Sequence, residues 1–394
     1  MIFTLEALQA GTGDCLILVY GDADAPRFVV IDGGPGGIYD GSLRPRLERL
    51  HGQFANPDTG KLDLEMVMVS HIDDDHIHGI LDWMDEIGDE AAVDCNIATL
   101  WYNSFDDAVG RTSPAVRTHV AAFAEEAVRA GIPEEGTISP LTARVLAASV
   151  KQGRELRAHA MARGIVLNGG FAGAGGAPGL VMAPASGRET ITRGNGLKLH
   201  VIGPNQKNLD KLEQDWAEDV AKNPDPVRVA SFVDRSVPNL SSIVVVAEFQ
   251  GRRMLLTGDA RGDFIRDGLA SAGFLDSAGR VHFDVIKMPH HGSNRDMRLD
   301  WLQKITADHY VISANGQFGN PDADTVEWIC QARGDDRYTI HLTNEAMVDP
   351  KTGQDVGALV KKALADNPGA NRTVDFRKKT GSSVKADVLD PWTR

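Results

Sequence analysis

The sequence predicts an α/β fold in which two sheets are flanked by helices. Short apolar runs of strand length alternate with stretches of helical period in both halves of the chain. Several of these runs end in Asp, His, Gly or Ser, at the place where α/β proteins assemble their sites. The 394 residues are 42% hydrophobic and 24% charged, which is the composition of a globular protein with a large core.

The first half of the chain begins with strands and then turns helical. Strands are expected at 2–8, 15–20, 27–31 and 64–70, and a helix at 79–87. Residues 113–167 are rich in alanine with apolar residues at helical spacing, which predicts two or more amphipathic helices. We therefore expect residues 1–104 to form the first half of a domain and residues 105–196 a mostly helical insertion.

Strand patterns return in the second half of the chain. They cover 197–202, 241–249, 253–257, 284–288, 309–313 and 338–342, with helical stretches between several of them. Residues 197–345 are therefore expected to complete the domain. Residues 346–394 are expected to form a C-terminal extension that packs on it.

Charge and cysteine content limit the classes of function. The formal net charge of −14 argues against broad attraction to nucleic acid, although Arg372 and residues 377–379 form a local basic cluster near the C-terminus, a pattern more typical of a solvated surface. Cys15, Cys95 and Cys330 have no paired spacing, so we expect buried thiols and no disulfide. Without a signal-peptide pattern or an apolar run of membrane length, the sequence favours a cytoplasmic location and no membrane partner.

A dense group of metal-ligand types follows the strand expected at 64–70. His71, Asp73, Asp75 and His76 lie within six residues, and imidazole and carboxylate groups are the ligands that zinc, manganese and iron accept. Residues at alternating positions that leave a strand project to one side, so these donors are expected to converge on metal ions. A structural explanation would have to solvate four adjacent ionisable groups after an apolar strand.

Two later strands also end in ligand types. The strand at 253–257 runs into Thr257-Gly258-Asp259, and the strand at 284–288 runs into Pro289-His290-His291-Gly292-Ser293. A single Asp after a strand is more often a turn or cap residue, whereas the adjacent histidines are harder to explain structurally.

These motifs, in this order, resemble the metallo-β-lactamase superfamily, whose metal motif is His-x-His-x-Asp-His. Within it the chain is similar to the ComEC-type hydrolase domain of bacterial DNA-uptake channels, in which Asp replaces the second histidine, as Asp73 does here. The matching segments span residues 1–104 and 197–345 and comprise Gly11-Thr12-Gly13-Asp14, Asp32-Gly33-Gly34, Asn239-Leu240-Ser241-Ser242-Ile243-Val244, Thr257-Gly258-Asp259 and Pro289-His290-His291-Gly292-Ser293.

The resemblance implies a four-layer αββα sandwich with a helical insertion, and two divalent ions, Zn²⁺ or Mn²⁺, with Mg²⁺ as a further candidate. It implies the following metal ligands: His71 and Asp73 for one ion, Asp75 and His76 for the other, Asp259 as a bridge and His290 from the last motif, with His291 on the substrate side and exchangeable with His290. Residues expected to support ligands or contact substrate are Asp32, His78, Ser242, Ser293, Asn315 and Asn320.

Two positions depart from the superfamily pattern. Ser241 and Ser242 stand in the strand where the superfamily often has a further metal-binding histidine, and Asn320 precedes Pro321 where the branch often has histidine. One ion is therefore expected to keep an extra water, and the contact to substrate or leaving group is expected to differ.

The predicted function is a hydrolase that uses a metal-activated water. Asp75 is the candidate to orient that water and His291 the candidate to stabilise the oxyanion or protonate the leaving group. The oxygen-rich ligands favour a phosphodiesterase or nuclease acting on a nucleotide or nucleic acid. Two alternatives stay open: a hydrolase of a lactone, thioester or β-lactam, and a non-catalytic sensor or binding module that docks a protein partner or a second copy through residues 105–196.

Overall fold

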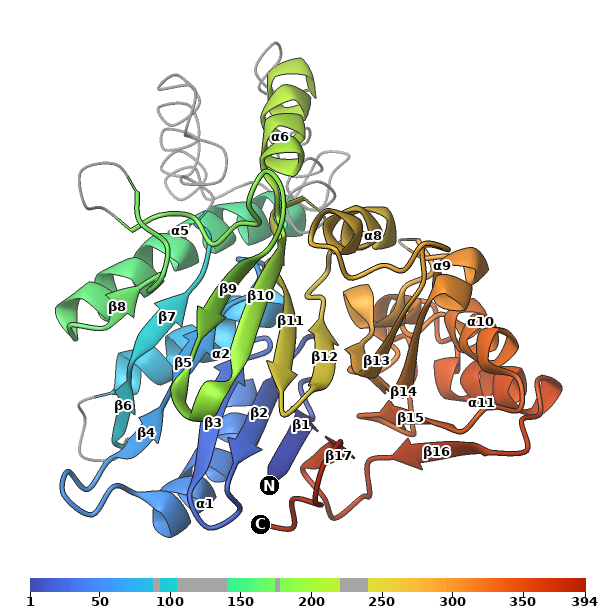
Figure 1. Ribbon diagram of the computed structural model, residues 1–394, viewed down its shortest axis with the longest axis horizontal. Coiled ribbons are helices and arrows are strands. Elements are labelled where there is room, and N and C mark those ends of the chain that lie inside the picture. Colours follow the sequence, from blue (N-terminus) through green and yellow to red (C-terminus); the bar gives the residue numbers. More distant parts are fainter. Residues whose placement is uncertain (88–92, 105–139, 174–177, 220–239, 296) are drawn as a thin grey trace.

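The computed structural model describes residues 1–87, 93–104, 140–173, 178–219, 240–295 and 297–394. They form a mixed α/β structure (Figure 1). The segment at 105–139, where part of the helical insertion is predicted, lies outside the described residues. Within the described part, no helix combines the length and the apolar character that a membrane span requires.

The first sheet has seven strands in the order β17-β1-β2-β3-β5-β7-β8. Pairing is antiparallel from β17 to β3 and parallel from β3 to β8. The strands are β1 (Ile2–Leu8), β2 (Leu16–Gly21), β3 (Pro26–Ile31), β5 (Met66–Met68), β7 (Thr99–Trp101), β8 (Val166–Leu167) and β17 (Ser383–Asp387). A small separate pair joins β4 (Leu62–Leu64) to β6 (Cys95–Ile97).

The second sheet has eight strands in the order β16-β15-β14-β13-β12-β11-β10-β9. The run from β12 to β16 is parallel and the rest is antiparallel. The strands are β9 (Glu189–Thr192), β10 (Lys198–Gly203), β11 (Val244–Phe249), β12 (Arg252–Leu256), β13 (Val281–Lys287), β14 (Ile305–Ile312), β15 (Tyr338–Leu342) and β16 (Arg372–Phe376).

Alternation of buried side chains along the strands explains how the two sheets pack. One set of apolar residues from both sheets, including Phe3, Leu18, Val245 and Val285, forms a core between them. The opposite face of the first sheet packs against α1 (Arg44–Phe54), α2 (Asp74–Glu86) and α5 (Pro140–Ala162). The opposite face of the second sheet packs against α8 (Gly262–Ser271), α9 (Leu299–Lys304), α10 (Ala323–Arg333) and α11 (Val356–Asp366).

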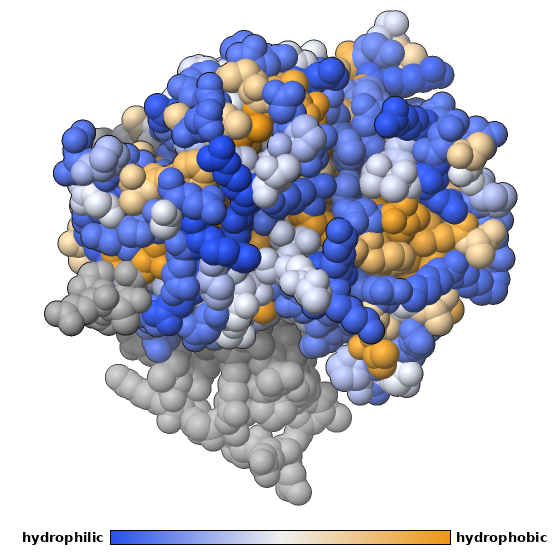
Figure 2. Space-filling model, turned by 90° about the horizontal axis from the view of Figure 1, so that it is seen from below, coloured by the Kyte–Doolittle hydropathy of each residue, from blue (hydrophilic) through white to orange (hydrophobic). Residues whose placement is uncertain are grey.

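One face of the molecule is mostly polar. The face in Figure 2 is largely hydrophilic and is interrupted by smaller apolar areas. Short helical segments, η1 (Tyr39–Leu43), η3 (Gly194–Gly196), η4 (Pro289–Gly292) and η5 (Gln317–Gly319), join the elements, and α6 (Gln206–Asp219) follows β10.

Each strand expected from the sequence has a counterpart, but the start of one helix needs correction. The helix expected at 79–87 is α2 and begins at Asp74, so Asp75 and His76 lie in its first turn and do not alternate on an extended chain. The residues expected to form a mostly helical insertion also supply β8 to the first sheet and β9 to the second. The C-terminal segment is built into both sheets as the edge strands β16 and β17.

Candidate metal centre

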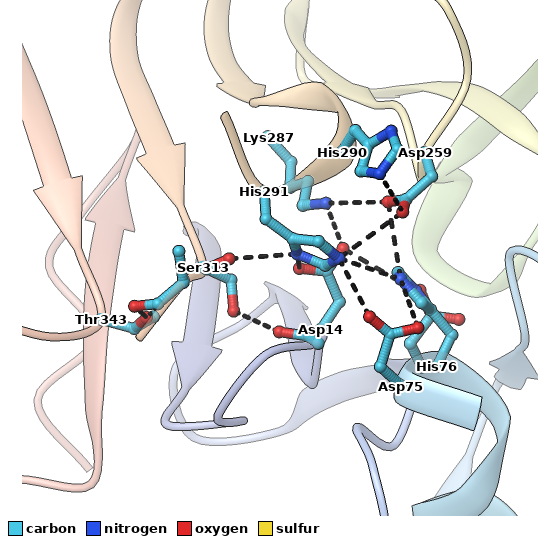
Figure 3. Close-up of polar contacts among 12 residues, drawn as sticks. Asp14, Asp75, His76, Asp259, Lys287, His290, His291, Ser313 and Thr343 are labelled. Atoms are coloured by element: carbon cyan, nitrogen blue, oxygen red, sulfur yellow. Dashed lines mark hydrogen bonds and ion pairs between the residues drawn. The ribbon is translucent and has the colours of Figure 1, made fainter. Parts of the chain in front are cut away.

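Four segments of the chain bring ionisable side chains together, and Figure 3 shows several of these side chains pointing toward one another. The loop between β1 and β2 carries Asp14, and the segment from β5 through the first turn of α2 carries His71 to His76. The turn after β12 carries Asp259, and η4 after β13 carries His290 and His291. Close backbone approach holds the first two together: the backbone N–H of Asp14 donates to the carbonyl of Asp75, at 3.3 Å.

The backbone is left-handed at three of the residues that shape this centre. Asp32, His290 and His291 have φ angles of 57°, 47° and 54°, a region that is uncommon for residues other than glycine. Such conformations persist only where the surroundings impose them, and they concentrate at functional sites.

Three histidines present the same ring nitrogen to the centre. The Nδ1 atom of His76 donates to Asp32 Oδ2 at 2.8 Å, and that of His291 donates to the carbonyl oxygen of Ser313 at 3.1 Å. The Ser70 hydroxyl donates to Asp32 Oδ2 at 2.7 Å and can therefore accept from His71 Nδ1 at 3.1 Å. With Nδ1 engaged as a donor, each Nε2 atom is left to act as a metal ligand.

Carboxylates surround these Nε2 atoms. Asp259 lies 3.5 Å from both His76 and His291 and 3.9 Å from His71. Asp75 lies 3.5 Å from His291 Nε2 and 3.9 Å from His76 Nε2. The two Nε2 atoms of His76 and His291 are themselves 3.3 Å apart.

These separations suit metal ligation. Two ligand atoms that are each bound to one ion at tetrahedral angles lie about 3.4 Å apart, given the usual zinc–nitrogen and zinc–oxygen bond lengths. Within the described residues, two overlapping groups can each surround an ion: Asp14, His76, Asp259 and His291, and His71, Asp75 and His76. His71 Nε2 and Asp259 Oδ1 are buried without a hydrogen-bond partner, as expected of atoms that bind a metal ion.

A buried ion pair adjoins the histidines and was not predicted from the sequence. Lys287 and Asp14 are in direct contact, and both side chains are 1% exposed. The ammonium also lies 4.0 Å from Asp259 Oδ1 and donates to the Gly258 carbonyl at 3.4 Å. Lys287 therefore holds the Asp14 carboxylate, which lies 3.5 Å from His291 Nδ1.

Both partners were visible in the sequence but their pairing was not. Asp14 is the last residue of the glycine-rich motif, and Lys287 is a charged residue in the apolar strand β13. In that strand Val285 faces the other sheet and Ile286 faces the helices, so Lys287 points toward Asp14. A lysine at a strand position that faces the protein interior was the feature of the sequence that indicated a buried charge.

Electrostatics favour positive charge in the middle of the cluster. Burial alone would raise the pKa of Asp259, but His291, His76 and His290 hold it well below its usual range. Burial opposes protonation of His76 and His291, yet the carboxylates, Asp259 foremost, raise the pKa of both well above the usual value. In contrast, burial and the neighbouring His76 lower the pKa of His71 to about 3. A bound cation would replace the protons that the carboxylates attract.

The two adjacent histidines differ in their positions. The side chain of His291 is 4% exposed and faces three other members of the cluster, whereas that of His290 is 27% exposed with Nε2 3.9 Å from Asp259 Oδ2. The sequence left His290 and His291 exchangeable as the ligand, and this geometry favours His291. Asp73 and Asp75 are 23% and 30% exposed and mark the open side of the cluster, with Asp73 Oδ2 3.8 Å from His71 Nε2.

Asp32 and Ser242 hold residues of the cluster in position through hydrogen bonds. Asp32 accepts from the Ser70 backbone N–H at 2.6 Å in addition to His76 and the Ser70 hydroxyl. Ser242 Oγ accepts from the backbone N–H of Asp259 at 3.3 Å. His78, in contrast, is turned along α2, with Nδ1 2.8 Å from Asp74 Oδ1.

The remaining predicted residues shape loops beside the cluster. Ser293 Oγ accepts from the Arg295 N–H, Asn315 Oδ1 accepts from the Gln317 N–H, and the Asn320 carbonyl accepts from the Gly316 N–H. Asn239 lies outside the described residues.

Comparisons with known proteins do not indicate a function for this chain. No protein-family model and no curated protein matches the chain. Among solved structures, it is similar to the crystal structure of a protein of unknown function from Enterococcus faecalis V583. The identity is 9% and the TM-score 0.28, with 96% of this chain and 78% of that chain covered. A likeness of this degree supports no assignment.

Proposed function

We propose that the protein is a metal-dependent hydrolase of the metallo-β-lactamase fold that cleaves phosphodiester bonds in a nucleotide or nucleic acid. The observation that carries the proposal is the convergence of three histidine Nε2 atoms with Asp75 and Asp259, each histidine being fixed through Nδ1. Two packed sheets with helices on their outer faces support the αββα assignment.

The residues would divide the work as follows. His71, His76, His291, Asp75 and Asp259 would hold one or two divalent ions, with Zn²⁺ and Mn²⁺ suited to the mixture of nitrogen and oxygen donors. When bound, such ions lower the pKa of a coordinated water and polarise the phosphoryl group. Asp75, the most exposed of these carboxylates, would orient the attacking water and accept its proton.

His290 is the candidate to protonate the leaving group. Its side chain is the most exposed histidine of the cluster, and its Nε2 atom stays within 3.9 Å of Asp259. This assignment exchanges the roles first expected for His290 and His291. Buried Lys287 would contribute a fixed positive charge beside Asp259.

One observation favours a phosphodiester over a lactone, thioester or β-lactam. At least three carboxylates line the cluster, and hard oxygen ligands suit ions that bind phosphate oxygens.

A cytoplasmic location is also part of the proposal, because all three cysteines are free and buried.

The proposal is tested by metal analysis of the purified protein, followed by assays with Mn²⁺ or Zn²⁺. The substrates are bis-p-nitrophenyl phosphate, single-stranded DNA, duplex DNA and nitrocefin. We expect at least one bound metal per chain and hydrolysis of the phosphodiesters. Turnover of nitrocefin alone would reject the phosphodiesterase assignment.

Matched histidine variants locate the activity. His71→Ala and His291→Ala are expected to lose both metal and hydrolysis. His290→Ala is expected to keep the metal and lose hydrolysis. His282→Ala is the control, because His282 is exposed and pairs with Asp308 at the opposite end of β13. If His71→Ala retains full metal and full activity, the cluster is not the active site.

A further inference from the structure

The loop that follows β14 presents an exposed aromatic residue beside the metal cluster. Phe318 is 73% exposed and has a φ angle of 60°, an outlier for a bulky side chain. Its loop is closed by a hydrogen bond from the Gly316 N–H to the Asn320 carbonyl at 3.0 Å. An exposed phenylalanine in a strained backbone gains nothing for the core, which points to a role in binding.

The base of this loop is attached to the metal cluster on two sides. Ser313, which begins it, accepts from His291 Nδ1 and donates through its hydroxyl to the Gly13 carbonyl at 2.7 Å. At its far end, the Asp322 N–H donates to the Gly292 carbonyl at 3.1 Å. Phe318 therefore stands at the tip of a loop that is fixed to the cluster at both of its ends.

A basic cluster lies further along the same edge. The parallel strands β13, β14, β15 and β16 are neighbours in this order, so their carboxyl ends meet at one edge (Figure 1). Contacts link these ends in turn: the Ala314 N–H donates to Thr343 Oγ1 at 3.1 Å, and Arg377 Nε donates to the Thr343 carbonyl at 2.8 Å. The exposed pair Lys378 and Lys379 follows directly.

The positive charges of Lys378 and Lys379 can attract an anionic ligand. Within the described residues, no ion pair involves Lys378 or Lys379, and the nearby acid Glu345 is paired with Lys361 at 3.0 Å. From β13 to β16 the edge spans three strand spacings, about 14 Å. That length corresponds to about four stacked nucleotides at roughly 3.4 Å each.

We propose that Phe318 and the pair Lys378–Lys379 form a binding strip for a single-stranded polynucleotide whose scissile phosphodiester lies at the metal cluster. The inference rests on the proposed function and names its substrate. Aromatic rings that stack on bases, combined with basic groups that follow the backbone, are how proteins bind single strands without sequence preference. Duplex DNA pairs its bases inside the helix and offers no free base to Phe318.

The test measures binding of fluorescein-labelled (dT)12 by anisotropy, with the metal chelated so that the strand is not cleaved. Phe318→Ala is expected to weaken binding about 5- to 150-fold, the range found for loss of one stacked base, while Phe318→Trp retains it. Lys378→Ala/Lys379→Ala is expected to reduce the slope of log K against log salt by about 1.4, since each phosphate contact on a single strand contributes about 0.7.

The control is Arg280→Ala/Lys304→Ala, which removes the same charge from the opposite ends of β13 and β14. We expect this variant to bind (dT)12 within twofold of the wild type. Melting temperatures establish that each variant is folded.

Hydrolysis of bis-p-nitrophenyl phosphate separates the two proposals, because this ester cannot reach the lysine pair. If the wild type cleaves it but both strip variants bind (dT)12 as tightly as the wild type, the strip is refuted and the proposed function stands. If (dT)12 binds through the strip but no phosphodiester is cleaved, the strip stands and the proposed function fails. Equal effects of the strip and control double variants would also refute the strip.

Discussion

Replacing Lys287 by methionine is expected to destabilise the protein strongly. The change leaves the Asp14 carboxylate buried, at 1% exposure, without its cation and close to Asp259. Removing one partner of a buried ion pair typically costs about 3 to 5 kcal/mol. Natural domains have about 5 to 15 kcal/mol of stability, so this loss is a large fraction of the total.

The double variant Asp14→Asn/Lys287→Met distinguishes the burial of a lone charge from a simple loss of packing. Both charges are then absent, so we expect it to be more stable than Lys287→Met alone. Replacing a whole buried pair by uncharged groups is often close to neutral. Lys361→Met is the control: it breaks the exposed pair with Glu345, for which about 0 to 1 kcal/mol is expected.

The assay is urea unfolding followed by tryptophan fluorescence in EDTA, which removes any contribution from bound metal. A loss below about 1 kcal/mol for Lys287→Met would refute the reasoning, because that value is typical of an exposed pair. A double variant less stable than Lys287→Met would refute it as well, because the two charges would then not compensate each other.

Three further predictions concern packing, pH and metal. Gly79→Ala should lower the free energy of unfolding by about 1 to 3 kcal/mol, because the added methyl group collides with the Gly33 carbonyl. Gly52→Ala should raise it by about 0.5 to 1 kcal/mol, because Gly52 lies in α1 with open space around it. Equal midpoints of urea unfolding for the two variants would contradict this prediction. Burial and neighbouring His341 lower the pKa of His309 to about 4. The unfolded chain, with a pKa of about 6.5, therefore binds more protons between these values, and stability falls as pH drops through this window. His309→Gln should reduce this loss of stability at low pH. An unchanged pH dependence of stability would argue against the assignment to His309. Zn²⁺ at 100 times its Kd should stabilise the protein by about 2.7 kcal/mol, and His71→Ala should abolish this shift in thermal melts.

The sequence predicted the strands because their apolar runs are local signals. Asp259 and His291 each follow such a run, and the structure brings the two side chains to 3.5 Å from each other. The start of α2 was missed because Asp74 and Asp75 lack the apolar spacing of a helix. Acidic residues are nevertheless favourable in the first turn, where the helix dipole is positive.

Features that depend on contacts between residues far apart in the chain could not be predicted from the sequence. The edge strands β16 and β17 join different sheets although only six residues separate them. The contact of Asp14 with Lys287 requires both sheets to be in place. The choice between His290 and His291 depends on backbone angles near 50° at both residues, which a residue pattern does not encode.

The net charge of −14 is compatible with a polyanionic substrate, because the range of a charge depends on salt. At 0.15 M ionic strength the Debye length is about 8 Å, so exposed acids beyond that distance are largely screened. The lysines close to the bound strand then determine its electrostatic attraction. At 0.01 M it is about 30 Å, comparable to a domain, and the acids of the whole chain repel the strand. We therefore expect the plot of log K against log salt for (dT)12 to flatten or turn over at low salt. A straight line down to 0.01 M, measured by anisotropy, would contradict the idea that a local basic strip works against an acidic surface.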